Sequence, residues 1–130
     1  MAIDITEYKT LYITTARDLI KNMNHALLVM RNDTCDQKAI REFHRAAHSF
    51  KSQSLVMCYT QTGLAAKILE HIFRDLVDQL TCVTAEIIPL IENMVKKLNE
   101  SINSIENQQG EIDLTHETEQ LSKFTSIPVA

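Results

Sequence analysis

The sequence is poor in the residues that interrupt helices and build tight turns. Its 130 residues include only two glycines, two prolines and no tryptophan. A β-rich fold of this length needs many turns, so this shortage argues against one. The plentiful residues, among them leucine, isoleucine, alanine, glutamate and lysine, are common in helices. The composition therefore predicts one all-α domain, long enough for a hydrophobic core.

Positive charge and long apolar runs are also scarce. The 13 Lys and Arg residues face 17 Asp and Glu residues, and the net charge of −4 argues against nucleic acid as a partner. No apolar run approaches the ~18 residues that span a bilayer, and the N-terminus has no signal-peptide pattern, so we expect no membrane insertion.

The three cysteines, Cys35, Cys58 and Cys82, are odd in number and widely spaced, and they form no CxxC pattern. Spacings of this kind match neither a zinc site nor a disulfide framework. We therefore expect reduced thiols in a cytoplasmic protein. Cys58 and Cys82 in particular are expected to be small buried hydrophobic residues.

Apolar residues recur at intervals of three and four along four long segments, which is the pattern of amphipathic helices. The predicted helices cover residues 5–30, 36–57, 62–79 and 85–105. Thr34 or Asp36 is expected to cap the second helix, and Pro89 fits the first turn of the fourth. Such helices with short connections predict an up-down-up-down antiparallel four-helix bundle.

The C-terminal part predicts a smaller element. Residues 107–110, which read NQQG, form the clearest loop in the chain. A short fifth C-terminal helix is expected over residues 115–124, capped by Thr115. The helical domain is therefore expected to cover residues 1–124, with residues 125–130 as a tail or the start of a linker.

One histidine in the second predicted helix is displaced from its apolar face. Ile40, Phe43, Ala47 and Phe50 share that face. Since successive helical residues turn by about 100°, His48 lies about 120° from the centre of the face. We therefore expect its ring at the edge of the buried seam, with at least one nitrogen within reach of solvent.

A carboxylate occupies the equivalent place on the third predicted helix, where Glu70 also lies about 120° from the centre of the apolar face. If the two helices are antiparallel neighbours, their flanks meet and this carboxylate can face the imidazole of His48. A carboxylate that accepts from Nδ1–H fixes the tautomer in which Nε2 keeps a free lone pair. It also makes Nε2 a better nucleophile toward phosphorus.

Basic residues gather around His48. Lys51 follows it by three positions, on the same side of the predicted helix, where its ammonium can lie against a phosphoryl group. Between residues 36 and 52 four basic residues face two acidic ones, so this segment is positive in a negative chain. Such local polarity suits an acidic partner or a phosphodonor.

These residues carry a family resemblance. Residues 46–54, AAHSFKSQS, resemble the phosphorylation-site motif of histidine phosphotransfer (HPt) domains, most closely the amino-terminal HPt domain of CheA-type chemotaxis kinases. The pair Tyr59-Thr60 resembles the aromatic–threonine pair that opens the next helix of that family. Leu69-Glu70 resembles its hydrophobic–glutamate pair. The likeness covers nearly the whole chain, and residues 42–73 are its specific part.

The resemblance implies a role for each residue of this segment. His48 would be the phosphoacceptor, Glu70 its hydrogen-bond partner and Lys51 an accessory cation. The surrounding side chains would contact partner proteins: His44, Arg45, Ser52 and Lys67. Those partners would be a histidine kinase ATP-binding domain and a response-regulator receiver domain. ATP and magnesium would belong to the partners, so we expect no cofactor here and a phosphorelay domain that is not itself an enzyme.

The sequence departs from the family pattern at three positions. Ser52 and Cys58 stand where the family usually has glycine, and Lys67 stands where chemotaxis kinases often carry histidine. Ser52 adds a hydroxyl beside the expected phosphoacceptor. The rate of phosphotransfer and the partner surface are the properties that these changes affect.

Three other interpretations remain open from the sequence. The chain could be a stand-alone HPt protein of a multistep phosphorelay, or a helical scaffold that is never phosphorylated. His44 and His48, four residues apart, could also bind a metal ion. However, the glutamate that a metalloprotease places after its first histidine is missing, and Arg45 and Lys51 oppose a cation. We therefore predict no metal site.

Overall fold

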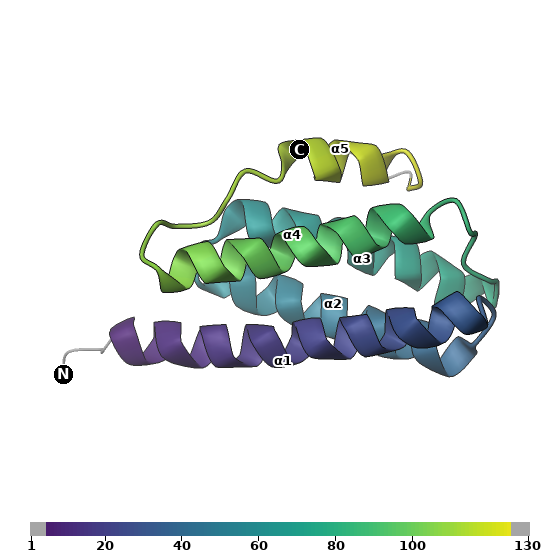
Figure 1. Ribbon diagram of the computed structural model, residues 1–130, viewed down its shortest axis with the longest axis horizontal. Coiled ribbons are helices and arrows are strands. Elements are labelled where there is room, and N and C mark those ends of the chain that lie inside the picture. Colours follow the sequence, from purple (N-terminus) through teal and green to yellow (C-terminus); the bar gives the residue numbers. More distant parts are fainter. Residues whose placement is uncertain (1–4, 126–130) are drawn as a thin grey trace.

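The computed structural model describes residues 5–125, and every regular element in that range is a helix. Four long helices, α1 (Ile5–Asn32), α2 (Gln37–Val56), α3 (Thr60–Gln79) and α4 (Ile88–Glu106), form an antiparallel bundle (Figure 1). The short helix α5 (Thr115–Ser122) packs on α3 and α4. The all-α five-helix prediction is confirmed. Apart from Thr125, the expected tail lies outside the described residues.

The apolar faces of all four long helices meet in one core. The residues that placed the predicted face of α2 are all buried: Ile40, Phe43, Ala47 and Phe50. Across the α2–α3 contact the rings of Phe43 and Phe73 stack with centroids 4.1 Å apart. Aromatic pairs at this distance add to the stabilisation from burial alone. The packing of α2 on α3 therefore fixes the relative position of their flanking residues.

The helix boundaries follow from local chemistry. Asp36 is the N-cap of α2, and its carboxylate accepts a hydrogen bond from the Ala39 amide at 3.0 Å, as expected. The helix α3 begins two residues earlier than predicted, and α4 begins at Ile88, three residues later. Proline lacks an amide hydrogen, so Pro89 must lie in the first turn, and this requirement moves the start of α4 along the chain.

The N-terminus of α5 differs from the prediction. Leu114 occupies the cap position, and Thr115 is the first helical residue. Asp113 accepts a hydrogen bond from the Thr115 amide at 2.9 Å. The carboxylate of Asp113, rather than the Thr115 side chain, therefore satisfies an amide at the start of α5. The helix ends at Ser122, two residues before the predicted end.

The prediction for the cysteines is wrong. Cys35 and Cys82 form a disulfide, their sulfurs are bonded across a sequence separation of 47, and both residues are exposed. Cys58 is free but exposed, with φ of 65° in the turn between α2 and α3. Spacing in the sequence missed the pair because antiparallel helices bring the loop before α2 and the loop after α3 to the same end of the bundle. The Val83 amide also donates to the Thr34 carbonyl across these loops, at 2.9 Å.

The N-terminus of α3 is held by a carboxylate from a distant loop. Glu111, between α4 and α5, accepts from the Thr62 amide at 2.7 Å, the Thr62 hydroxyl at 2.7 Å and the Gln61 amide at 3.3 Å. These amides have no acceptor within their own helix. Glu111 thereby ties the segment that leads to α5 to the start of α3.

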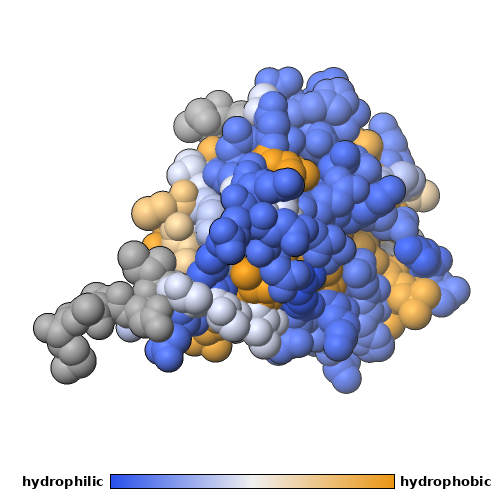
Figure 2. Space-filling model, turned by 60° about the vertical axis from the view of Figure 1, so that its left-hand side comes forward, coloured by the Kyte–Doolittle hydropathy of each residue, from blue (hydrophilic) through white to orange (hydrophobic). Residues whose placement is uncertain are grey.

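Most of the surface is polar. The face in Figure 2 is hydrophilic over most of its area, and apolar side chains appear on it in separate patches. Between residues 5 and 125 no helix is both long and apolar enough to cross a membrane.

Candidate functional site

The structure brings His48 and Glu70 into direct contact. Nδ1 of His48, on α2, is hydrogen-bonded to Oε2 of Glu70, on α3. An ionised carboxylate can only accept, so Nδ1 carries the proton, and in a neutral ring this tautomer leaves the lone pair on Nε2. The His48 side chain is 55% exposed, whereas that of Glu70 is 0% exposed. The site therefore combines an accessible ring with a carboxylate fixed inside the protein.

Two cations share the other oxygen of this carboxylate. Oε1 of Glu70 accepts from Nζ of Lys51 at 3.0 Å and from Nη2 of Arg74 at 3.3 Å. Lys51 comes from α2, one turn after His48, and Arg74 comes from α3, one turn after Glu70. Lys51 was predicted from the sequence, whereas Arg74 was not. The signal was available, because oppositely charged residues four apart on a helix are neighbours.

These partners decide the protonation of Glu70. Burial raises the pKa of its carboxyl group, but the hydrogen bonds from Lys51 and His48 and the charge of Lys51 outweigh burial. The net result is a pKa below the ordinary value. Glu70 is therefore ionised at neutral pH, which is the state that accepts from Nδ1–H.

The four expected partner-contact residues surround this site with different exposure. Arg45 is exposed, whereas His44, Ser52 and Lys67 are half-buried. Nε2 of His44 is buried and has no hydrogen-bond partner within the described residues. Burial lowers the pKa of His44, so this ring is neutral at neutral pH and differs in character from exposed His48.

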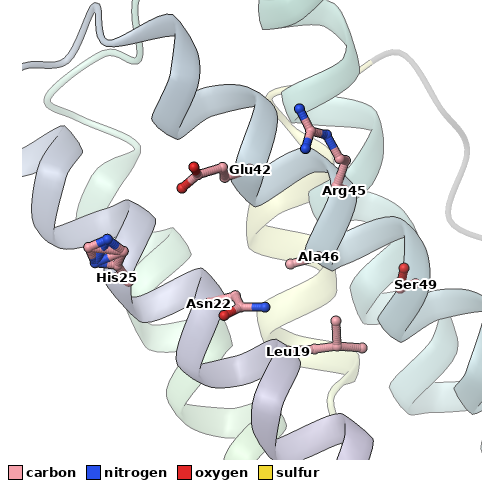
Figure 3. A pocket seen from close by; sticks show the side chains of 7 residues that line it. All are labelled: Leu19, Asn22, His25, Glu42, Arg45, Ala46 and Ser49. Atoms are coloured by element: carbon pink, nitrogen blue, oxygen red, sulfur yellow. The ribbon is translucent and has the colours of Figure 1, made fainter.

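A polar groove lies between α1 and α2. It is lined on α2 by Glu42, Arg45, Ala46 and Ser49 and on α1 by Leu19, Asn22 and His25. Figure 3 shows His25 and Asn22 on one side of the groove and Glu42 on the other. His48 and Glu70 are not among the lining residues, so the groove is separate from this pair.

Metal binding finds no support in the described part of the chain. Between residues 5 and 125 no group of three or more His, Cys, Asp or Glu side chains is arranged to hold a metal ion. His44 and His48 therefore lack a third ligand there. Both oxygens of Glu70, the carboxylate in contact with His48, already accept hydrogen bonds.

Comparison with known protein families agrees with this geometry. The family model of the Hpt domain matches residues 7–118, which cover all four long helices except the first two residues of α1. The chain belongs to the Hpt domain family. The matched range contains both His48 and Glu70.

One relative with a known name is a chemotaxis protein. The chain is 24% identical to the chemotaxis protein CheA of Bacillus subtilis (strain 168) over 102 residues. That match covers 78% of this chain but only 15% of the CheA sequence, so the Hpt chain spans a small part of that relative's length.

Two solved structures have the same fold. The phosphorylated P1 domain of CheA3 in complex with CheY6 from R. sphaeroides matches with a TM-score of 0.82 and 20% identity, over 91% of this chain and 95% of that one. The CheA phosphotransferase domain from Thermotoga maritima matches with a TM-score of 0.74 and 20% identity, over 79% and 98%.

Proposed function

We propose that this Hpt domain is a phosphoryl carrier of a CheA-type chemotaxis system. His48 accepts a phosphoryl group from the ATP-binding domain of a histidine kinase and passes it to an aspartate of a response-regulator receiver domain. One observation carries the proposal: Nδ1 of exposed His48 is bound to the buried carboxylate of Glu70. This pairing leaves Nε2 as the free nucleophile.

The chemistry follows from the state of the ring. The Nε2 lone pair attacks phosphorus and forms the N–P bond while the bond from phosphorus to the leaving oxygen of ATP breaks. The Nδ1 proton stays in place, so the ring gains positive charge, which the ionised Glu70 stabilises. The receiver aspartate then attacks phosphorus, and the N–P electron pair returns to Nε2.

Protein partners must supply the rest of the reaction. ATP and magnesium belong to the kinase and the receiver, and this domain acts as a phosphoacceptor that catalyses nothing alone. An apolar hollow beside Ser52 supports a protein partner, because Leu11 and Val56 on its rim are 63% and 81% exposed. Large exposed apolar side chains of this kind mark interaction surfaces.

Phosphorylation in trans tests the proposal. The Hpt chain is incubated with radiolabelled ATP and a CheA kinase fragment that lacks its own phosphotransfer domain. We expect label that is acid-labile and base-stable, as an N–P bond requires, and its loss in His48→Gln. Equal labelling of His48→Gln would refute His48 as the acceptor.

Transfer to a partner is the second part of the test. Phosphorylated protein is mixed with a chemotaxis receiver domain and magnesium, and loss of label from the Hpt chain is followed with time. We expect fast transfer to the receiver. Binding of the receiver without phosphotransfer would instead favour a non-phosphorylated scaffold.

A further inference from the structure

The Glu70 carboxylate accepts hydrogen bonds from two cationic side chains, and these come from different helices. Lys51 belongs to the helix that carries His48, whereas Arg74 belongs to the helix that carries Glu70 itself. Both donate to the same oxygen, Oε1, while Oε2 is occupied by Nδ1 of His48. One of the two cations can therefore leave without exposing the carboxylate to an unpaired, buried state.

Lys51 is the cation suited to leave. Its ammonium is a compact charge on a flexible stem with three rotatable donors. A phosphoryl group brings roughly two negative charges to the exposed edge of the ring, one turn from Lys51. That charge competes with Oε1 for the ammonium. The guanidinium of Arg74 has a planar fork and stands four residues after Glu70, which keeps it beside the carboxylate.

The other ionisable groups near Glu70 contribute little charge. His44 on α2 and His71 on α3 both lie within electrostatic range, and burial lowers the pKa of each, so both are neutral at neutral pH. On α3, the charge of Lys67 lowers the pKa of His71 further, and the charge of Asp78 raises that of His44 without outweighing burial. Once Lys51 turns away, Arg74 is the lysine or arginine side chain left in hydrogen-bond contact with Glu70 among the described residues.

We propose that Arg74 is a positioning residue that holds the Glu70 carboxylate on His48 while Lys51 moves to the phosphoryl group. This inference rests on the proposed function, because it concerns the phosphorylated state. A buried carboxylate without a cation is costly and takes up a proton or turns away. Once Lys51 has moved, Arg74 adds its charge to that of the phosphorylated ring and so keeps the carboxylate ionised and aligned.

Phosphoramidate tests this step without any protein partner. This small phosphodonor transfers its phosphoryl group to Nε2 as its P–N bond breaks and ammonia leaves. The variants are Arg74→Gln, which removes the charge, and Arg74→Lys, which keeps it. Arg41→Gln is the matched control, because Arg41 is exposed on α2 and has no ion pair with Glu70. Circular dichroism of each variant establishes that it is folded.

We expect Arg74→Gln to lower the maximal phosphorylation rate about five-fold without changing the phosphoramidate concentration at half-maximal rate, as fits a partly exposed charged hydrogen bond. Arg74→Lys should restore most of the rate, and Arg41→Gln should match the unaltered protein. Since the donor concentration dependence stays the same, this pattern separates positioning of the ring from binding of the donor.

The decisive measurement is the carbon-13 chemical shift of the Glu70 carboxyl group at neutral pH, where the N–P bond is stable, before and after phosphorylation. In the unaltered protein this shift should stay that of an ionised carboxylate, because Arg74 remains. In Arg74→Gln it should move toward that of a protonated carboxyl group on phosphorylation, because Lys51 leaves and only the ring itself remains beside the carboxylate. A general structural defect would change the shift equally in both states.

Two outcomes would overturn the inference: rates and carboxyl chemical shifts of Arg74→Gln equal to those of Arg41→Gln, or an Arg74→Lys protein as slow as Arg74→Gln. Failure of the proposed function looks different. In that case the unaltered protein takes up no phosphoryl group at His48, whereas failure of this inference alone leaves His48 phosphorylated in every variant.

Discussion

The middle of α3 and its two ends are held in different ways. Glu70, in the middle, is bound to side chains that reach the surface: His48, Lys51 and Arg74. At the N-terminus, Glu111 binds backbone amides. Just beyond the C-terminus, Cys82 is bonded to Cys35. Both glutamates connect distant parts of the chain, but only one has partners that can change charge or move. The contacts at the two ends of α3 therefore hold the bundle together, whereas the contacts in its middle form the candidate phosphorylation site.

Reduction of the disulfide should have the largest effect on the stability of the fold. For a closed loop with a sequence separation of 47, the loss of chain entropy in the unfolded state predicts destabilisation by about 3–4 kcal/mol. Urea unfolding with and without a reducing agent measures it. The variant Cys35→Ser with Cys82→Ser should match the reduced protein, and Cys58→Ser should remain sensitive to reduction. Equal stability in both conditions would mean that the loops alone fix this end.

Glu70→Gln should have the largest effect on the chemistry. Glutamine keeps the shape but loses the charge that fixes the Nδ1–H tautomer and stabilises the phosphorylated ring, so phosphorylation by phosphoramidate should slow about 10- to 100-fold. Circular dichroism should show an intact bundle. An unchanged rate would mean that the carboxylate does not orient the ring.

Glu111→Ala should show the opposite pattern. The Thr62 and Gln61 amides lose their acceptor, and we expect the free energy of unfolding to fall by about 1–2 kcal/mol, as for loss of a helix cap. Phosphorylation of His48 should keep its rate. If this variant loses rate in proportion to Glu70→Gln, the distinction between the middle and the ends of α3 is wrong.

The smallest expected effect is on the acid dependence of stability. The pKa of Glu70 lies below its ordinary value of 4.5 in the folded protein, so its ionised form contributes stability above that value. This contribution is lost as the pH falls through the lower, folded-state pKa. Urea unfolding below pH 4.5 should therefore show a shallower decline in Glu70→Gln than in the unaltered protein. Parallel declines would contradict the lowered pKa.

The sequence predicted those features that depend on local periodicity. The spacing of Ile40, Phe43, Ala47 and Phe50 placed α2 and its buried face, and the same wheel put His48 at the edge of that face. The contact between His48 and Glu70 followed once α2 and α3 were taken as antiparallel neighbours. These inferences needed only the helical repeat and one assumption about topology.

Other features depend on loops, whose paths no periodicity fixes. Glu111 reaches the start of α3 from a segment without a repeat, and the pairing of Cys35 with Cys82 depends on how two loops meet. The complete burial of Glu70 also exceeded what its place on the flank indicated, because side chains from both helices cover it. Arg74 is the exception, since its spacing from Glu70 was visible in the sequence.

The disulfide has a topological consequence. The chain from Cys35 to Cys82 is a covalent ring, and this ring contains His48, Lys51, Glu70 and Arg74. Two copies of the protein could exchange α1, or α4 with α5, without opening it. In the oxidised protein, α2 and α3 of one copy cannot be divided between two molecules by such an exchange. Every copy in a domain-swapped assembly would therefore carry a complete site made from its own chain.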